Sequence, residues 1–287
     1  MSVSVQLLLI FVMAIFANVK VYFGSSAKID NTEYALKFNS VVFGVVGCAF
    51  LVFVVGQSIS KTTVISSVAY AAASVIFQLF YVMALDHGPI SIVVLLANLA
   101  TVPAAIGGAL IFKEGFQLTQ IIGLTLTAAS MVFTMKSGRD KKSNKGYVYG
   151  VIAMFASSVA LLIQRYHQKT EFANERNRFL CIAYLFAAVM ALIVLLIIKR
   201  LKKGTESTAK KNYFGLGVGA GLALVVYQFL LIYLSGKATA MLMYPALAGL
   251  TTIMNVIMCV TLFKEKVSRR QLIGLAVGAV AIVIMSL

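Results

Sequence analysis

The chain of 287 residues is 61% hydrophobic and 12% charged, and its mean hydropathy is +0.95. A soluble domain has about a quarter of its residues charged, so this composition excludes a water-soluble globular protein. The net charge of +16 is high enough for nucleic-acid binding, but the basic residues gather in short connectors between apolar blocks, where they orient helices and contact anionic lipid. We therefore expect a protein that is embedded in a lipid bilayer and binds no nucleic acid.

Ten apolar stretches are long enough, at about 20 residues, to cross a bilayer as helices. In chain order they lie near residues 3–23, 36–56, 63–85, 90–112, 118–135, 147–165, 178–198, 213–235, 238–263 and 268–287. The first stretch has no signal-peptide cleavage pattern, so we expect it to remain in the mature protein. The sequence therefore predicts an all-α integral membrane protein with ten transmembrane helices.

One motif occurs twice in the chain. The pattern F-K-E-x5-Q-x-I-G-L spans residues 112–124 and again residues 263–275, which are 151 positions apart. Identity continues at roughly a third of positions when the alignment is extended over residues 98–134. The earlier helices match as well, because Gln78 aligns with Gln228. Repetition of polar residues at nearly the same offset, 151 positions for the motif and 150 for the two glutamines, indicates a duplicated unit rather than shared apolar composition.

The duplication predicts two five-helix units. Residues 1–135 form the first unit, residues 136–146 a basic linker, and residues 147–287 the second unit. An odd number of spans in each unit forces the second copy to cross the membrane in the opposite direction, which predicts inverted repeats related by a pseudo-two-fold axis. Inverted halves can open a central site to one face and then to the other, so this arrangement favours transport over a purely structural scaffold.

The motif resembles that of the drug/metabolite transporter (DMT) superfamily, in its ten-helix branch with two EamA-type domains. The resemblance covers nearly the whole chain and rests on Glu114, Gln120, Gly123, Glu265, Gln271, Gly274, Lys20 and Lys37. It implies a basket of helices 1–4 and 6–9 around a central cavity, with helices 5 and 10 outside as scaffold or as the contact of a homodimer; the alternative is a monomer. It also implies a multi-pass protein of the cell (inner) membrane that exports or exchanges a small metabolite.

The acidic residues limit the kind of transport. All nine fall at or beyond the predicted helix ends, so no carboxylate is expected at the membrane midplane, where a charge costs about 2.5–3.5 kcal/mol. Small multidrug exporters, which resemble half of this architecture, use a glutamate in their first helix. We therefore expect a carrier of a small polar metabolite, such as an amino acid or a related solute. Efflux of drugs or lipid-linked substrates, a channel and a scaffold are the alternatives.

Uncharged polar residues inside the spans are the main candidates for substrate binding. Gln78 and Gln228 occupy equivalent positions in the third and eighth spans, and each amide must find partners inside hydrocarbon. They either line the cavity or tie neighbouring helices together. Weaker candidates of the same kind are Tyr81, Tyr227, Asn98, Tyr244 and Asn255.

Basic residues and prolines supply further candidates. Lys20 and Lys37 would give the cavity a positive end that attracts a carboxylate or phosphate of the substrate, although Lys20 is also close enough to the membrane interface to snorkel. Arg165 looks more like an anchor at the end of its helix than a substrate ligand. Pro103 and Pro245 remove backbone donors within their spans and are candidate gates.

Enzyme chemistry is not expected. The histidines, His87 and His167, lie at predicted helix ends without clustered carboxylates, metal-ligand spacing or a nucleophile elbow. We therefore predict no catalytic residues, no metal site and no cofactor, and the expected partners are a small-molecule substrate and the lipid bilayer.

The sequence gives two indications of the side of the membrane on which the termini lie, and they disagree. Seven Lys and Arg residues fall on the side shared by both termini and eighteen on the other side, so the positive-inside rule places both termini outside. The family resemblance implies instead that both termini are cytoplasmic. The sequence leaves both orientations open.

Overall fold

The structure, a computed structural model, describes residues 2–27, 32–54, 56–87, 90–114, 117–134, 144–201, 213–262 and 268–286. The described part of the chain is helical and contains no strand. Most of the expected linker (residues 136–143) and the start of the second motif copy (residues 263–267) lie outside these ranges.

Eleven α-helices and one short 3-10 helix account for the described chain. They are α1 (Val3–Ser26), α2 (Thr32–Leu51), α3 (Lys61–His87), α4 (Ile90–Leu99), α5 (Thr101–Ile111), α6 (Leu118–Thr134), α7 (Asn144–Lys169), η1 (Ala173–Glu175), α8 (Arg176–Leu201), α9 (Tyr213–Ser235), α10 (Ala240–Thr261) and α11 (Arg269–Ser286). Among the described residues, seven helices are long and apolar enough to cross a membrane. The presence of several such helices indicates a multi-pass membrane protein.

The ten expected spans all fall on helices, but two expectations need correction. The second helix covers residues 32–51 rather than 36–56, because the apolar residues that follow Leu51 form an exposed turn. The fourth expected span is two helices, α4 and α5, separated at Ala100. Pro103 explains this break, since it has no N–H to donate to the carbonyl of Leu99 four residues earlier.

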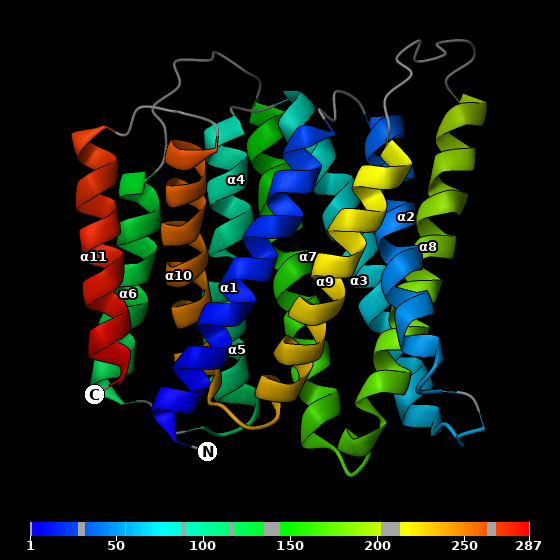
Figure 1. The fold of residues 1–287 in the computed structure, drawn as a ribbon, viewed down its shortest axis with the longest axis horizontal. Coiled ribbons are helices and arrows are strands. Elements are labelled where there is room, and N and C mark those ends of the chain that lie inside the picture. Colours follow the sequence, from blue (N-terminus) through cyan, green and yellow to red (C-terminus); the bar gives the residue numbers. More distant parts are fainter. Residues whose placement is uncertain are drawn as a thin grey trace.

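Both termini lie at the same end of the bundle, the lower end in Figure 1, which we call the termini end; the other end is the far end. Helix α1 begins at the termini end, whereas α7 begins at the far end. Apart from α4 and α5, which follow each other in the same direction, successive α-helices run in alternating directions.

The two halves of the chain share one bundle. Helix α3 packs against α7 and α8, and α9 packs against α1 and α2. Helices α2 and α8 are neighbours, and α6 and α11 pack on each other beside α10, at the left edge of the view in Figure 1. Because the strongest contacts join one half to the other, the two sequence units do not form separate globular domains.

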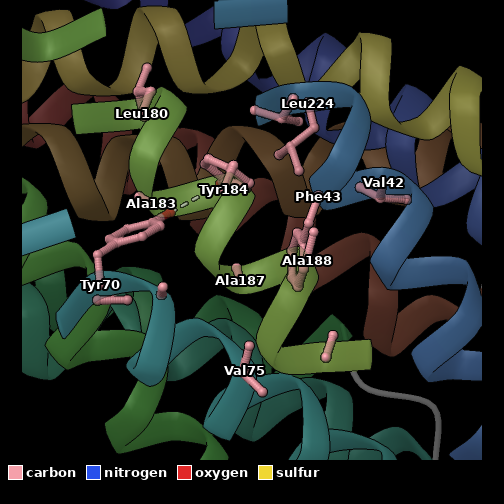
Figure 2. Packing of buried hydrophobic residues seen from close by; sticks show 14 of the residues in the cluster. Val42, Phe43, Tyr70, Val75, Leu180, Ala183, Tyr184, Ala187, Ala188 and Leu224 are labelled. Atoms are coloured by element: carbon pink, nitrogen blue, oxygen red, sulfur yellow. Dashed lines mark hydrogen bonds between the residues drawn. The ribbon is translucent and has the colours of Figure 1, made fainter. Parts of the chain in front are cut away.

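The largest hydrophobic cluster lies between α2, α3, α8 and α9. Figure 2 shows Phe43, Tyr70 and Leu224 of this cluster facing the small side chains of α8. Small residues allow helices to approach closely: a Cβ added to Gly47 of α2 would lie 2.7 Å from the side chain of Leu185 in α8. A second cluster joins α1, α5 and α10 around Ile10 and Met241.

Packing is denser at the termini end. Residues 240–249, the first part of α10, are all buried, whereas residues 250–256 are all only half-buried. Burial also falls in the middle of α3, where residues 76–81 beyond the buried Val75 are half-buried or exposed, and it returns at Val82 and Ala84. Since both helices begin at the termini end, α10 and the middle of α3 are packed more loosely toward the far end than at their starts.

Candidate functional site

Four polar side chains form a hydrogen-bonded chain inside the bundle, one from each of four helices. The hydroxyls of Tyr70 (α3) and Tyr184 (α8) lie 3.0 Å apart, along the dashed line in Figure 2. The amide nitrogen of Gln228 (α9) donates to the Tyr70 hydroxyl at 3.3 Å. The amide nitrogen of Gln164 (α7) in turn donates to the amide oxygen of Gln228 at 3.3 Å. We call these four residues the polar chain.

The polar chain is almost completely removed from the surface. The exposed fractions are 5% for Tyr70, 3% for Tyr184, 6% for Gln228 and 1% for Gln164. Polar groups buried at this depth cost free energy unless they are hydrogen-bonded. The exception within the polar chain is Oε1 of Gln164, which has no hydrogen-bond partner in the described structure. This oxygen is a free acceptor for an N–H or O–H donor that enters the bundle.

The two glutamines expected to be equivalent have different surroundings. Gln228 belongs to the polar chain, whereas Gln78 lies eight residues beyond Tyr70 on α3 and is half-buried. Gln78 makes no hydrogen bond to another described residue, and the structure does not join it to Gln228. Its amide is therefore available in the looser part of the bundle.

Three further sequence candidates are partly accessible. Lys20, Tyr81 and Tyr227 are each half-buried. The ring of Tyr81 also packs against Phe77, with centroids 5.6 Å apart. The structure does not join these three side chains to the polar chain by a hydrogen bond between described residues.

The remaining uncharged candidates are dispersed. Tyr244 is buried near the start of α10, where its hydroxyl donates to the backbone carbonyl of Leu161 in α7 at 3.1 Å. Asn255 lies in the half-buried part of α10, and Asn98 is exposed near the end of α4. None of these three bonds to the polar chain.

An ion pair with a neighbouring carboxylate compensates the charge of Lys37. Its ammonium lies 2.7 Å from the carboxylate of Glu33, one turn earlier in α2. The same carboxylate lies 3.4 Å from Lys199 of α8. Lys20, in contrast, forms no ion pair with a described residue, so the structure separates the two lysines that the sequence grouped together.

The two prolines also differ. Near Pro103 the helix is interrupted: α4 ends at Leu99 and α5 begins at Thr101. The hydroxyl of Ser158 in α7 donates to the carbonyl of Ala100, between them, at 2.7 Å. Pro245 lies inside α10, which continues through it. Only the first of the two therefore coincides with a break between helices in the described chain.

Arg165 is fully buried, so its interpretation as an anchor at the membrane interface is wrong. Its guanidinium forms an ion pair with Glu114, which follows α5. It also donates to the backbone carbonyls of Ser235 at 3.0 Å and Ala238 at 2.8 Å, at the end of α9. These contacts engage both terminal nitrogens of the buried guanidinium, whereas its Nε has no hydrogen-bond partner in the described structure.

Glu114 extends this cluster to α10. Its second oxygen accepts a hydrogen bond from the backbone N–H of Ala240, the first residue of α10, at 2.8 Å. A carboxylate is favourable at a helix N-terminus. We call Arg165, Glu114, Ser235, Ala238 and Ala240 the clasp, because together they tie α5, α7, α9 and α10 at the termini end.

A second buried cluster closes the same end. Nε2 of His167 lies 3.0 Å from the Thr63 hydroxyl in α3, and the ring stacks on Phe179 with centroids 4.6 Å apart. Glu175 accepts hydrogen bonds from the backbone and hydroxyl of Ser60 at 3.1 Å and 3.0 Å. His167, which the sequence placed at a helix end, is thus part of the closed packing.

Sequence reasoning missed Tyr70, Tyr184 and Gln164 and misplaced Arg165. The tyrosines and Gln164 lie in spans without any repeated motif, so their meeting depends on how α3, α7, α8 and α9 pack. A usable signal existed for Arg165: the topology places both Arg165 and Glu114 at the termini end of their helices, where opposite charges can pair.

Comparison with known proteins identifies the fold. No model of a protein family matches the chain, and no curated protein matches it. Among solved structures, 29 chains match; one of them, described only as "Crystal structure of protein", has a TM-score of 0.74 and 15% sequence identity over 98% of this chain and 96% of that chain. The chain therefore has, over nearly its whole length, a fold that is known from solved structures.

Proposed function

We propose that the protein is an alternating-access carrier of a small polar metabolite, such as an amino acid or a related solute, in the cell membrane. The polar chain supports this proposal most directly. It lies inside helices that are long enough to span the hydrocarbon, on the termini side of the point where burial along α3 and α10 decreases. At 1.5 Å per residue its members lie about 8–13 Å above the helix ends at the termini end. Polar groups are expensive at such depth and commonly mark substrate paths.

The expected inverted repeat is part of this proposal. Suppose that α1, α2 and α3 of the first half correspond to α7, α8 and α9 of the second half. The contact between α1 and α9 then corresponds to the contact between α7 and α3, and the contact between α2 and α9 corresponds to that between α8 and α3; all four contacts are present. The contacts α2–α8 and α6–α11 map onto themselves. A pseudo-two-fold axis in the membrane plane would produce this pattern, together with the opposite directions of α1 and α7.

Membership of the DMT superfamily and its EamA-type branch also remains part of the proposal. It agrees with a helix bundle built from both halves and with α6 and α11 packed at one side. In the sequence, eighteen Lys and Arg residues fall on the side opposite the termini and seven on the side of the termini, so the positive-inside rule would make the side opposite the termini cytoplasmic. On that orientation a bundle closed at the termini end is ready to load a solute from the cytoplasm, as an exporter or exchanger requires.

Transport by purified protein in liposomes tests the function. A panel of labelled amino acids and related metabolites is expected to include a solute with saturable uptake, and preloading the vesicles with the same unlabelled solute is expected to accelerate entry of the label. Vesicles containing Gln228→Leu are the matched control. Linear flux without acceleration would indicate a channel, and no flux above empty vesicles for the whole panel would contradict the carrier.

A further inference from the structure

Two cations lie over the same aromatic ring at the termini end. The guanidinium of Arg176, the first residue of α8, lies 5.4 Å from the centroid of the Tyr233 ring and 5.9 Å from that of the Phe229 ring. The ammonium of Lys237, just after α9, lies 4.6 Å from the Tyr233 centroid and donates to the Tyr233 hydroxyl at 2.9 Å. Contacts between a cation and the face of a ring are favourable and hold each charge in place. We call Arg176, Tyr233 and Lys237 the cationic cluster.

The charges of the cationic cluster have no acidic partner in the described structure. Arg178, two residues after Arg176, pairs with Glu175, whereas neither Arg176 nor Lys237 forms an ion pair with a described residue. Glu171, in the connection between α7 and η1, pairs with neither of them. Because both cations lie close to one ring, their charges are no more than about 10 Å apart, which is the Debye length in about 0.1 M salt, so they still repel each other. An anion bound beside both would remove this cost.

Both cations are accessible and keep donors for such an anion. Arg176 is half-buried and Lys237 is exposed. Arg176 donates no hydrogen bond to a described residue, so the five N–H groups of its planar guanidinium are open to a bidentate contact. Lys237 uses one of its three donors on Tyr233. Phosphate oxygens match this combination, because a guanidinium binds two of them as a fork and an ammonium adds a point charge.

The cationic cluster continues a lipid-facing stripe of α9. Leu222, Phe229 and Tyr233 are seven and four residues apart, so they share one side of the helix, and the buried Gly217 and Gln228 lie on the other side. Leu222 is 57% exposed and Phe229 37%, and exposed apolar side chains of a membrane-spanning helix contact acyl chains. Tyr233 lies in the last turn of α9, where tyrosine marks the boundary between hydrocarbon and water. The two cations therefore lie at the level of the lipid headgroups.

We propose that the cationic cluster binds the phosphate of an anionic phospholipid, whose acyl chains lie along Leu222 and Phe229. The net charge of the headgroup decides which lipid binds. A zwitterionic headgroup brings its own cation next to Arg176 and Lys237, whereas an anionic headgroup compensates both charges without adding one. The bound lipid joins the start of α8 to the end of α9, at the lower end of Figure 1.

Fluorescence quenching by brominated lipid tests the site. The chain contains no Trp, so Leu222→Trp adds a single fluorescent reporter beside the proposed acyl chains. The variant is reconstituted in mixed bilayers of phosphatidylcholine and phosphatidylglycerol, in which one lipid or the other carries brominated chains. The two quenching curves give the relative binding constant of the lipids at the reporter, which is expected to favour phosphatidylglycerol about tenfold.

Removal of the charges is expected to remove this preference. In the Leu222→Trp protein, Arg176→Gln and Lys237→Gln should each lower the preference several-fold and together bring it close to unity. Lys61→Gln is the matched control, because Lys61 is an exposed basic residue at the same end that contacts no ring in the described structure; it should leave the preference unchanged. A preference that survives in the double variant, or that Lys61→Gln lowers equally, would overturn the proposal.

A second reporter separates this site from the general attraction of anionic lipid to a basic protein. Val189→Trp, on the exposed apolar surface in the middle of α8, is expected to show a preference near unity, and a preference as large as that at Leu222→Trp would overturn the site. Replacement of chloride by inorganic phosphate at equal ionic strength should leave the preference at Leu222→Trp unchanged. Its loss would mean that the cluster binds free phosphate and not a lipid. Reporter emission without brominated lipid shows whether each variant keeps the reporter in hydrocarbon.

Discussion

At the scale of single residues, the function depends on where polar groups find partners inside lipid. The sequence pointed to Gln228 because an amide in an apolar span needs hydrogen bonds, and the structure gives it two, to Tyr70 and Gln164. The same reasoning could not separate Gln228 from Gln78, which lies in the looser half. The difference arises from packing around each amide, which a repeated motif does not encode.

Substitution of the two glutamines separates transport from stability. Gln78→Ala and Gln228→Ala are each expected to reduce initial uptake into proteoliposomes at least about tenfold, or about 1.4 kcal/mol of lost solute interaction. Gln228→Ala is also expected to lower the melting temperature, because Gln164 and Tyr70 lose their partner. Gln78→Ala should melt as the unmodified protein does. Normal uptake by both variants would remove the glutamines from the solute path.

The ion pair of the clasp is expected to be strongly coupled. Removal of one partner leaves an uncompensated buried charge, which costs about 3–5 kcal/mol. Arg165→Met and Glu114→Gln should each lower the free energy of unfolding measured by detergent titration, and the double variant should lose less than the two single losses together. Additive losses would mean that the pair does not act as a unit.

At the scale of helices, length and apolar content were enough to locate the spans, but not their ends or interruptions. The apolar run of α2 continues past Leu51 into an exposed turn, so composition placed its end too late. The break at Ala100 was not expected, although the sequence marked Pro103 as a site of bending. The break depends on a hydrogen bond that is missing: Pro103 has no N–H to donate to the carbonyl of Leu99, and the Ser158 hydroxyl of α7 donates to the neighbouring Ala100 carbonyl.

Restoring the missing donor tests whether this break serves transport. Pro103→Ala is expected to join α4 and α5 into one helix, raising the melting temperature and slowing counter-exchange. Pro245→Ala, in the continuous helix α10, is the matched comparison and is expected to change helix geometry less. If Pro103→Ala exchanges solute at the normal rate, the break is not a gate.

At the scale of the whole molecule, the apolar stretches suggested ten spans and the repeat grouped them into two units. All ten stretches fall on helices, and seven of the described helices are long and apolar enough to cross a membrane. What the sequence could not supply is the asymmetry between the two ends. Two similar halves in opposite orientations would make the two ends of the bundle alike if the halves had the same conformation. In the described structure the clasp and the buried His167 cluster lie at the termini end, and α10 is less buried toward the far end. That asymmetry is the property expected of a carrier in one of its two conformations.

Sided labelling tests alternating access most directly. Met241→Cys in the buried part of α10 and Asn255→Cys in its half-buried part are each placed in a protein without native cysteines, and a membrane-impermeant thiol reagent is applied to one face of oriented vesicles at a time. The account predicts that Asn255→Cys reacts only from the far end and Met241→Cys from neither. Adding Glu114→Gln, which breaks the clasp, should expose Met241→Cys to the termini end and reduce the reaction of Asn255→Cys. Labelling that does not change when the clasp is broken, or access to Asn255→Cys from both faces at once, would contradict alternating access.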